Sequence, residues 1–161
     1  MITTKLGSSP KIPKKNQPVL PLDQFWPYLV TVLADRIARR TSRIIKERNL
    51  NLSQWRVLVA IAEAPGRTSA EVVTITPMDK GIVSRATKAL LEMGYVRREA
   101  SQSDGRLSHL HLTKAGKELY LEIIPTVQEV TQIAGEGLSQ ERQERLSKEL
   151  NALIEVLPDL R

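Results

Sequence analysis

Basic and hydroxyl side chains recur at a four-residue spacing in the middle of the chain. Lys80, Ser84 and Lys88 follow one another by this spacing, with Gly81 and Arg85 beside them. On a helix they would share one face, because residues four apart are neighbours. A helix in the major groove of DNA needs short donors that reach base edges and long cations that reach guanine or phosphate. The pattern therefore predicts a helix that reads DNA, and Gly81 would let the helix backbone approach the DNA closely. The alternative is a basic helix face that is only exposed to solvent.

A further basic position lies at the tip of a predicted hairpin. Arg106 directly follows the pair Asp104 and Gly105, and Asp-Gly is a strong hairpin signal between strand-like segments. An arginine on a narrow, protruding element suits the enhanced negative potential of an A·T-rich minor groove. Asp104 is expected to orient Arg106 or to pair with Arg85, in addition to its ordinary part in the turn.

Two short capped helices are predicted to position the basic face. Thr68 and Glu71 have the spacing of a capping box, which opens the first helix. Thr76, followed by Pro77, repeats this start signal, and the second helix ends at Gly94. The predicted core face of this second helix is Ile82 or Val83, Ala86, Leu90 and Met93. Two helices separated by so tight a turn form a helix-turn-helix.

After the second helix the apolar residues alternate, as on a strand. Tyr95–Glu99 and Leu107–Leu112 are the two predicted strands of a hairpin. Arg97 and Arg98 are neighbours on the first strand and point to opposite faces, so one is free to contact phosphate and the other to form a surface ion pair. A hairpin attached to a helix-turn-helix is a winged helix. The expected fold class is therefore mainly α with a small β-hairpin wing.

Long helices flank the winged helix on both sides. An apolar stripe runs from about Leu22 to Asn49, and Thr113 and Ser139 are the caps of two further helices, the first bent by Pro125. Together they carry more apolar surface than one winged helix could cover, and such stripes are normally buried against a partner. The predicted divisions are a flexible basic arm (1–19), an N-terminal dimerisation helix (20–51), a DNA-binding lobe (52–114) and C-terminal dimerisation helices (115–161).

Composition narrows the function classes. The 161 residues include 24 Lys and Arg against 18 Asp and Glu, a net charge of +6, which favours a polyanionic partner. This excess lies ahead of residue 115, because residues 115–161 are net acidic. The absence of cysteine excludes disulfides, thiolate zinc sites and thiol-based sensing. With no apolar run long enough for a membrane span and no signal-peptide core, a cytoplasmic protein is expected.

Catalytic and cofactor-binding patterns are missing from the sequence. Paired carboxylates, Gly-rich phosphate loops, zinc-protease motifs and serine elbows do not occur, so we expect neither an enzyme nor a bound cofactor. His109 and His111 share one face of the second strand, a spacing that can bind a metal ion, but no acidic third ligand lies near them in the sequence. No metal site is predicted.

In order and spacing, five segments resemble the multiple antibiotic resistance regulator (MarR) family of bacterial transcription factors, and the resemblance covers about residues 22–158. The segments are Leu52–Leu58, Met78–Arg85, Gly94–Arg98, Asp104–Arg106 and Leu112–Gly116. The resemblance implies that DNA is contacted by Lys80, Ser84, Arg85 and Lys88 and, in the wing, by Asp104 and Arg106. Many members have a second basic residue where Gly105 stands, which implies one fewer cation in this wing.

The resemblance also implies a homodimer joined through its terminal helices. Two winged helices related by a two-fold axis would read half-sites about ten base pairs apart, so the operator is expected to be an inverted repeat. Family members commonly release DNA when a small anionic, often aromatic, compound binds between the dimerisation helices and the DNA-binding lobe. A dimeric, ligand-responsive repressor is therefore expected.

Three arginines on the first helix are candidates for holding such an anion. Arg40 falls on the otherwise apolar stripe, and Arg36 and Arg43 flank it. A partly buried arginine needs an anion, which an aromatic carboxylate or a coenzyme A thioester would supply. The alternative is that these arginines pair with acidic residues of the last helices, such as Glu144 or Glu149.

Trp26, Trp55 and Arg56 complete the candidate effector contacts. A tryptophan at a helical apolar position more often packs in a core than stacks on a ligand, so the core is the alternative for Trp26 and Trp55. Two rival functions also stay open. The first is a constitutive or architectural DNA-binding protein without an effector. The second is a helical protein-interaction module whose basic face serves only solubility.

Overall fold

The computed structural model describes residues 19–100 and 108–157. Its elements follow in the order α1 (Trp26–Lys46), α2 (Leu52–Glu63), α3 (Ser69–Ile75), α4 (Lys80–Glu92), β1 (Val96–Ala100), β2 (Ser108–Leu112), α5 (Lys114–Gly135) and α6 (Gln140–Val156). The chain divides into two compact units, residues 1–36 and residues 37–161, and the boundary lies inside α1. The predicted fold class, mainly helical with one β-hairpin, is confirmed.

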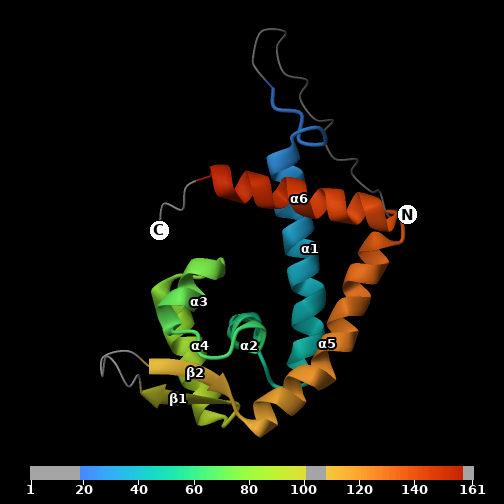
Figure 1. The fold of residues 1–161 in the computed structure, drawn as a ribbon. Coiled ribbons are helices and arrows are strands. Elements are labelled where there is room, and N and C mark those ends of the chain that lie inside the picture. Colours follow the sequence, from blue (N-terminus) through green and yellow to red (C-terminus); the bar gives the residue numbers. More distant parts are fainter. Residues whose placement is uncertain (1–18, 101–107, 158–161) are drawn as a thin grey trace, which may run out of the picture. The chain divides into compact units, whose positions relative to one another are not determined.

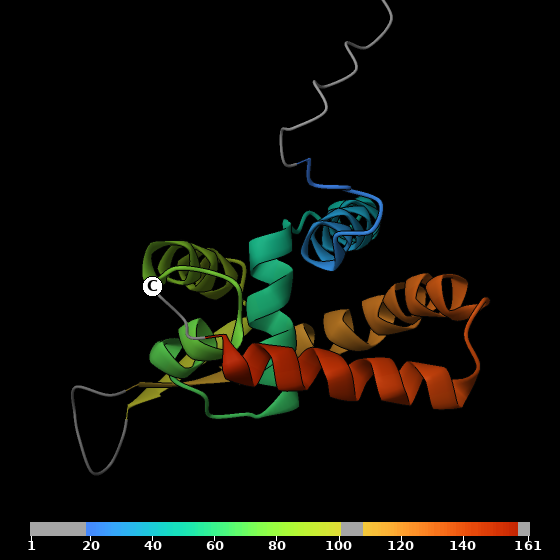
Figure 2. The same cartoon turned by 90° about the horizontal axis from the view of Figure 1, so that it is seen from above.

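The second unit contains the helix-turn-helix and its hairpin. α2, α3 and α4 pack on one another, and β1 and β2 pair antiparallel beside them (Figure 1). The strand register joins Val96 to Leu112 and Ala100 to Ser108. Seen from above, the hairpin extends outward from the three helices (Figure 2). This arrangement is a winged helix.

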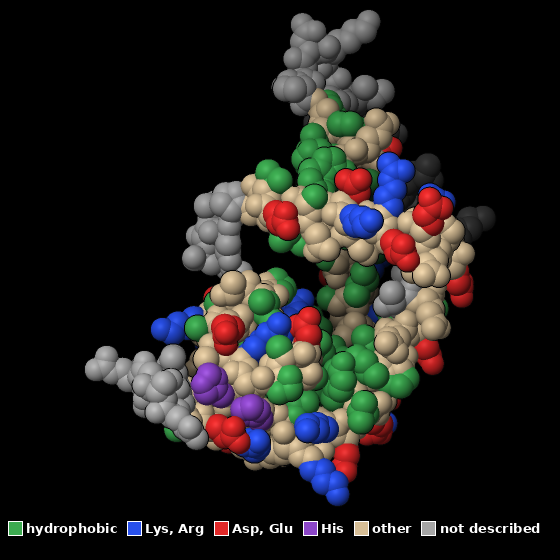
Figure 3. All heavy atoms as spheres, viewed as in Figure 1, with side chains coloured by type: hydrophobic (Ala, Val, Ile, Leu, Met, Phe, Trp, Pro, Cys, Tyr) green, Lys and Arg blue, Asp and Glu red, His purple; other side chains and the backbone are tan. Residues whose placement is uncertain are grey.

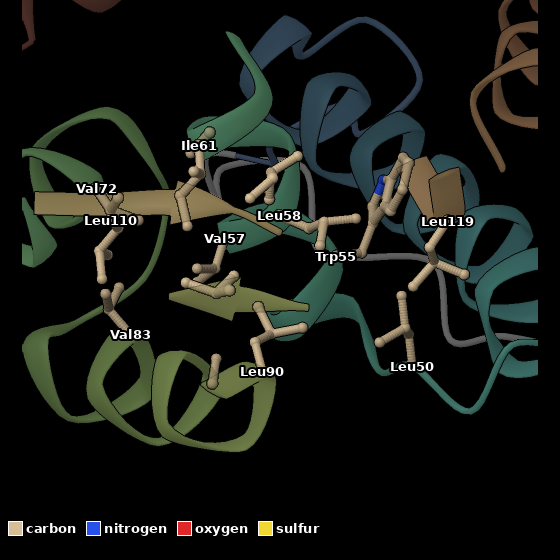
Figure 4. Close-up of a cluster of buried hydrophobic side chains, with 14 of the residues drawn as sticks. Leu50, Trp55, Val57, Leu58, Ile61, Val72, Val83, Leu90, Leu110 and Leu119 are labelled. Carbon is tan, nitrogen blue, oxygen red and sulfur yellow. The ribbon is translucent and has the colours of Figure 1, made fainter. Parts of the chain in front are cut away.

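One hydrophobic core holds this lobe together. Leu58 from α2, Leu90 from α4 and Leu110 from β2 are all completely buried and converge on it (Figure 4). Among the described residues, every buried apolar side chain lies between Ile45 and Ile123. Complete burial of one leucine contributes about 1.5–3 kcal/mol, so the stability of the fold is concentrated in this part of the chain.

The start of α4 differs from the prediction. Asp79 is its N-cap, and the Asp79 carboxylate accepts a hydrogen bond from the backbone amide of Ile82 at 2.7 Å. Thr76, which the sequence predicted as the cap, ends α3 instead, where its hydroxyl donates to the carbonyl of Val72 at 2.7 Å. Pro77 therefore lies in the connection rather than at the first helical position. The hydroxyl is already engaged by the preceding helix, and a carboxylate is the stronger acceptor for a backbone amide.

The predicted core face of α4 is wrong at its last position. Val83 and Leu90 are completely buried, whereas Met93 is 38% exposed. α4 ends at Glu92, and Gly94 turns the chain with a φ of +74°. That left-handed conformation favours glycine, so the helix ends at this point and Met93 becomes its C-cap, at the end of the core face.

The starts of α3, α5 and α6 were predicted correctly. The Thr68 hydroxyl accepts from the amide of Glu71, and the Glu71 carboxylate accepts from the amide of Thr68 at 2.7 Å. Thr113 and Ser139 are the N-caps of α5 and α6, and Pro125 lies inside α5. These signals are local in the sequence, because a cap satisfies amides within three residues of itself.

The terminal helices bury much less. α1 begins and ends inside the predicted range of Leu22 to Asn49, and α6 contains no buried residue. The large apolar side chains left exposed on these two helices are Trp26, Tyr28, Leu29, Val30, Leu33, Ile37, Leu146, Leu153, Ile154 and Val156. Within the described residues, no helix is long and apolar enough to cross a membrane.

Candidate nucleic-acid interface

The basic residues predicted to read DNA occupy one exposed face of α4. Lys80, Gly81, Ser84, Arg85 and Lys88 are all exposed. The other side of the helix inserts Val83, Ala86, Thr87 and Leu90 into the core. The core therefore fixes the rotation of α4 about its axis, and that rotation leaves the basic face free for a partner.

Gly81 lies between two charged side chains at the start of this face. A methyl group placed on Gly81 would lie 3.2 Å from Asp79 Oδ1 and 3.4 Å from Arg85 Nη1. The guanidinium of Arg85 thus folds back over the first turn of α4, toward the carboxylate that caps the helix. The absence of a side chain at Gly81 leaves room for the Arg85 guanidinium to lie over this turn.

The cations on this face are only lightly compensated. Lys88 Nζ lies 3.8 Å from Glu92 Oε1, and both side chains are largely exposed; such i,i+4 pairs contribute little. Within the described residues, neither Lys80 nor Arg85 forms an ion pair. The face therefore keeps a positive potential that favours phosphate.

Arg67 fixes the turn that precedes the helix-turn-helix, and the sequence analysis did not single it out. Its Nη1 donates to the carbonyl of Ala60 and to Glu63 Oε2, each at 2.6 Å, and its side chain is only 20% exposed. These bonds tie the end of α2 to the start of α3. Glu63 and Arg67 have the i,i+4 spacing of an ion pair on a helix. Because α2 ends at Glu63, however, the two residues do not share a helix, and that rule would not have predicted their contact.

The base of the hairpin carries its own charge cluster. Arg97 Nη1 forms an ion pair with Glu99, and His111 Nε2 lies 3.1 Å from the other oxygen of that carboxylate. The hydrogen bond from Arg97 is the main reason why the pKa of Glu99 lies below its ordinary value. Arg98, on the opposite face of β1, is exposed. Of the two neighbouring arginines, Arg97 is therefore the one engaged in a surface pair, and Arg98 is available to phosphate.

The wing residues Asp104, Gly105 and Arg106 lie outside the described residues, so their predicted DNA contacts stay predictions. The strands that lead to them are held in place. The Gly66 amide donates to the Leu110 carbonyl, and the Leu110 amide donates to the backbone carbonyl of Arg67, both at 2.9 Å. The hairpin is thus hydrogen-bonded to the loop after α2.

The arginines predicted to hold an effector lie along α1. Arg36, Arg40 and Arg43 are all exposed in the single chain, so the partial burial predicted for Arg40 is not present. Arg43 lines a small pocket of about 140 Å³ between the end of α1 and α5. Arg48 of the same pocket is neutralised by Glu122, with Nη2 2.6 Å from Oε1. Within the described residues neither Arg40 nor Arg43 forms an ion pair.

The aromatic candidates differ in burial. Trp55 is 5% exposed, and its ring stacks on that of Tyr120 with centroids 6.0 Å apart. Trp26 is 51% exposed. Arg56 is half-buried. It lines, together with Trp55, a pocket of about 260 Å³ between α2 and the end of α3. The structure thus brings Trp55 and Arg56 together.

A helix-turn-helix with an attached hairpin and an exposed basic face on its second helix defines a winged-helix DNA-binding protein. The MarR family model matches residues 48–107 of the chain, which include α2, α3, α4 and β1 of this lobe. The chain therefore has a winged-helix lobe similar to that of MarR-family regulators, and its curated relatives are HTH-type transcriptional regulators.

Two curated relatives illustrate the sequence likeness. An uncharacterized HTH-type transcriptional regulator of Staphylococcus aureus (strain MRSA252) is 29% identical over 119 residues, which cover 73% of this chain and 82% of the relative. The HTH-type transcriptional repressor IacR of Pseudomonas putida is 26% identical over 137 residues, covering 83% of this chain and 80% of the relative. Both relatives are described as HTH-type transcriptional regulators.

Solved structures share the fold. A MarR-family transcriptional regulator from Silicibacter pomeroyi superposes with a TM-score of 0.78 at 20% identity, over 87% of this chain and 95% of that one. A mutant of Escherichia coli MarR complexed with operator DNA superposes with a TM-score of 0.71 at 22% identity, over 87% of this chain and 100% of that one. The winged-helix architecture is therefore common to all three chains.

Proposed function

We propose that this regulator binds an inverted-repeat operator as a homodimer, with α4 of each copy in the major groove. The observation that carries the proposal is the exposed basic face of α4, where Lys80, Ser84, Arg85 and Lys88 stand opposite a buried apolar side. Two copies of that face related by a two-fold axis would read half-sites about ten base pairs apart. The basic wing residue Arg106, with Asp104, is proposed to enter the adjacent minor groove.

The apolar surface of the terminal helices supports a dimer. α6 has no buried residue, yet Leu153 and Ile154 lie on it, and Leu33 and Ile37 are similarly exposed on α1. Apolar patches of this kind mark sites of protein–protein contact. Their occupant is proposed to be a second copy of the same helices, because a two-fold interface uses the same patch on both copies.

The DNA-binding proposal is tested with an operator selected from random duplexes and measured by fluorescence anisotropy. Lys80→Ala and Arg85→Ala are each expected to weaken binding by about 5- to 150-fold, the range of one base or phosphate contact of about 1–3 kcal/mol. Lys148→Ala, an exposed charge on α6, is the matched control and should leave the affinity unchanged. Equal affinities for all four proteins would overturn the assignment of α4.

Salt dependence separates this proposal from a protein-interaction module. Each lost phosphate contact should reduce the slope of log affinity against log salt by about one. Specific binding that weakens steeply with salt supports operator recognition. If no duplex is retained at any salt concentration, the basic face serves another partner, and the interaction-module function is favoured.

The regulator is further proposed to be a cytoplasmic repressor that a small anion releases from DNA. A relative described as a repressor, the Pseudomonas putida protein, supports repression. The proposed anion contacts are Arg36, Arg40 and Arg43 of α1, with Trp26, Trp55 and Arg56 around them. Release requires only that the anion bind more tightly to a spacing of the two α4 helices that DNA does not accept. A differential affinity of about 1–3 kcal/mol is typical of such coupling.

The effector part has its own test. Aromatic acids and their coenzyme A thioesters are screened for compounds that raise the Tm and release operator DNA. Arg40→Gln should reduce both effects while operator affinity without the compound stays unchanged. If no anion produces both effects, the protein is a constitutive or architectural DNA-binding protein.

A further inference from the structure

We infer that Thr113 and Gly116 are positioning residues for DNA recognition. They fasten the start of α5 to the end of α4 and so set the direction in which α4 is presented. Neither residue lies on the basic face of α4, and neither was predicted to contact DNA. Their effect on recognition rests on the proposed function, because that function needs two α4 helices at a fixed separation.

The end of α4 is closed by a hydrogen-bonded cap. The Gly94 amide donates to the Leu91 carbonyl at 3.1 Å, and the Tyr95 amide donates to the Leu90 carbonyl at 3.0 Å. These two bonds form the Schellman motif that ends many helices. Leu90 is completely buried, so the cap is fixed to the core of the lobe. The carbonyls of Gly94 and Tyr95 then face the next element as acceptors.

Thr113 donates to both of these carbonyls. Its amide donates to Tyr95 at 3.0 Å, and its hydroxyl donates to Gly94 at 2.7 Å. The same hydroxyl oxygen accepts from the Gly116 amide at 3.1 Å and thereby caps α5. An N-cap needs only the acceptor. The donated bond to Gly94 is therefore an additional one, and it joins the cap of α4 to the cap of α5 through a single side chain.

Gly116 lets the two helix ends approach closely. It is buried, and a methyl group placed on it would collide with the backbone carbonyl of Tyr95. Along the same face of α5, Leu119 and Ile123 are 8% and 3% exposed. In the space-filling view, apolar side chains gather along the part of α5 that lies beside the lobe (Figure 3). The joint between α4 and α5 is therefore packed as well as hydrogen-bonded.

The geometry of this joint is felt at the far end of α4. The helix has 13 residues, a length of about 20 Å. A rotation of the lobe by about 10° about its junction with α5 would displace the start of α4 by about 3.4 Å, the rise of one base pair. The start of a recognition helix is the part that contacts base edges. A joint that resists such a rotation would therefore help to fix which half-site spacing is accepted.

A measurement without DNA tests the joint itself. The chain has no cysteine, so full-length protein carrying Ser84→Cys and Glu129→Cys takes spin labels only on α4 and α5. Diluted with unlabelled protein, it reports the distance between the two helices of one chain by double electron–electron resonance. Thr113→Asp should broaden or shift this distance distribution, because a carboxylate can cap α5 but cannot donate to Gly94. Thr113→Ser keeps both bonds and should leave the distribution unchanged.

Operator spacing tests the functional consequence. An operator selected with the unsubstituted protein is compared, by fluorescence anisotropy, with versions in which one base pair is inserted or removed between the half-sites. Thr113→Asp and Gly116→Ala should change the ratio of these affinities at least several-fold in favour of an altered spacing, and Thr113→Ser should preserve it. A loss of stability alone would weaken binding to every duplex alike and leave the ratio unchanged.

The two measurements distinguish the ways in which the inference could fail. Distance distributions that stay the same in Thr113→Asp and Gly116→Ala would overturn the joint, whatever the DNA result. Altered distributions with an unchanged spacing ratio would overturn the role in recognition. A protein that binds no duplex before substitution would instead contradict the proposed function, and the distance measurement would still decide the joint.

Discussion

The winged-helix lobe and the terminal helices hold their apolar residues in opposite ways. In the lobe, leucines such as Leu58 and Leu90 have no exposed surface. On α6 the comparable side chains Ile154 and Val156 are 70% and 77% exposed. Both regions have apolar stripes at helical spacing, so the stripe alone does not reveal how a helix is buried. The lobe covers its stripes within one chain, whereas much of the apolar surface of α1 and α6 stays exposed in the single chain.

The largest effect is expected inside the lobe. Leu58→Ala removes a completely buried side chain and should lower the free energy of unfolding by about 3 kcal/mol, the lost transfer free energy plus that of the cavity. Urea denaturation measures this change. Ile75→Ala, at a position 48% exposed on the same lobe, is the control and should cost well under half as much. Equal losses would mean that the lobe is not the stable unit.

The next largest effect is expected on the association of two copies into the proposed dimer. Leu33 lies on the apolar stripe of α1 and is 47% exposed, so Leu33→Asp would bury an unpaired charge in the proposed dimer. We expect dimer dissociation to be favoured at least about tenfold, or 1.4 kcal/mol, as measured by sedimentation. Thr31→Asp, on the opposite side of α1 by helical period, should leave association unchanged. If the unsubstituted protein is monomeric at all concentrations, the proposed contrast between the lobe and the terminal helices is contradicted.

A smaller and stabilising effect is expected within α4. Thr87 is completely buried, and its hydroxyl has no hydrogen-bond partner among the described residues. Thr87→Val replaces the hydroxyl by a methyl group and should raise the free energy of unfolding by about 1 kcal/mol. Thermal denaturation would show the gain as a higher Tm. Thr76→Val is the matched control: it removes a hydroxyl that donates to Val72, so it should destabilise the lobe.

The smallest effect concerns the cap of α3. The backbone amide and then the hydroxyl of Thr68 donate to Glu71, and these bonds lower the pKa of Glu71. The cap therefore contributes fully above the ordinary pKa of glutamate, and its contribution is lost as the pH falls through the lowered value. An NMR titration of the Glu71 carboxyl should show a midpoint below that of an unstructured glutamate. In Thr68→Ala the midpoint should return toward the ordinary value; an unchanged midpoint would contradict the assignment.

Local signals explain what was predicted correctly. The Thr68 and Glu71 capping box, the Gly94 stop and the basic face of α4 each depend on residues within one or two helical turns. Such features can be predicted from neighbouring side chains, because caps and faces follow from helical geometry alone. Thr76 was misassigned for a related reason. Two acceptors, Thr76 and Asp79, stood close enough to start the same helix, and only the hydrogen bonds show which one does.

Features that join distant segments could not be predicted from the sequence. Arg67 was missed because one of its partners is a backbone carbonyl, that of Ala60, and any residue type can supply that group. A pocket of about 280 Å³ between α2, the hairpin and α5 was missed because its lining residues, from Ile61 to Leu121, lie far apart in the chain. The burial of Arg40 was wrongly predicted from its place on an apolar stripe, since a stripe says nothing of what covers it.

The sequence by itself determined the winged-helix class and the residues of the α4 face, because caps, helical period and charge are properties of short segments. The tertiary structure decided how that face is turned outward, which of the two hairpin arginines is paired and where a pocket forms beside Lys117. Those outcomes depend on packing between α2, the hairpin and α5. Packing joins residues that no local pattern connects.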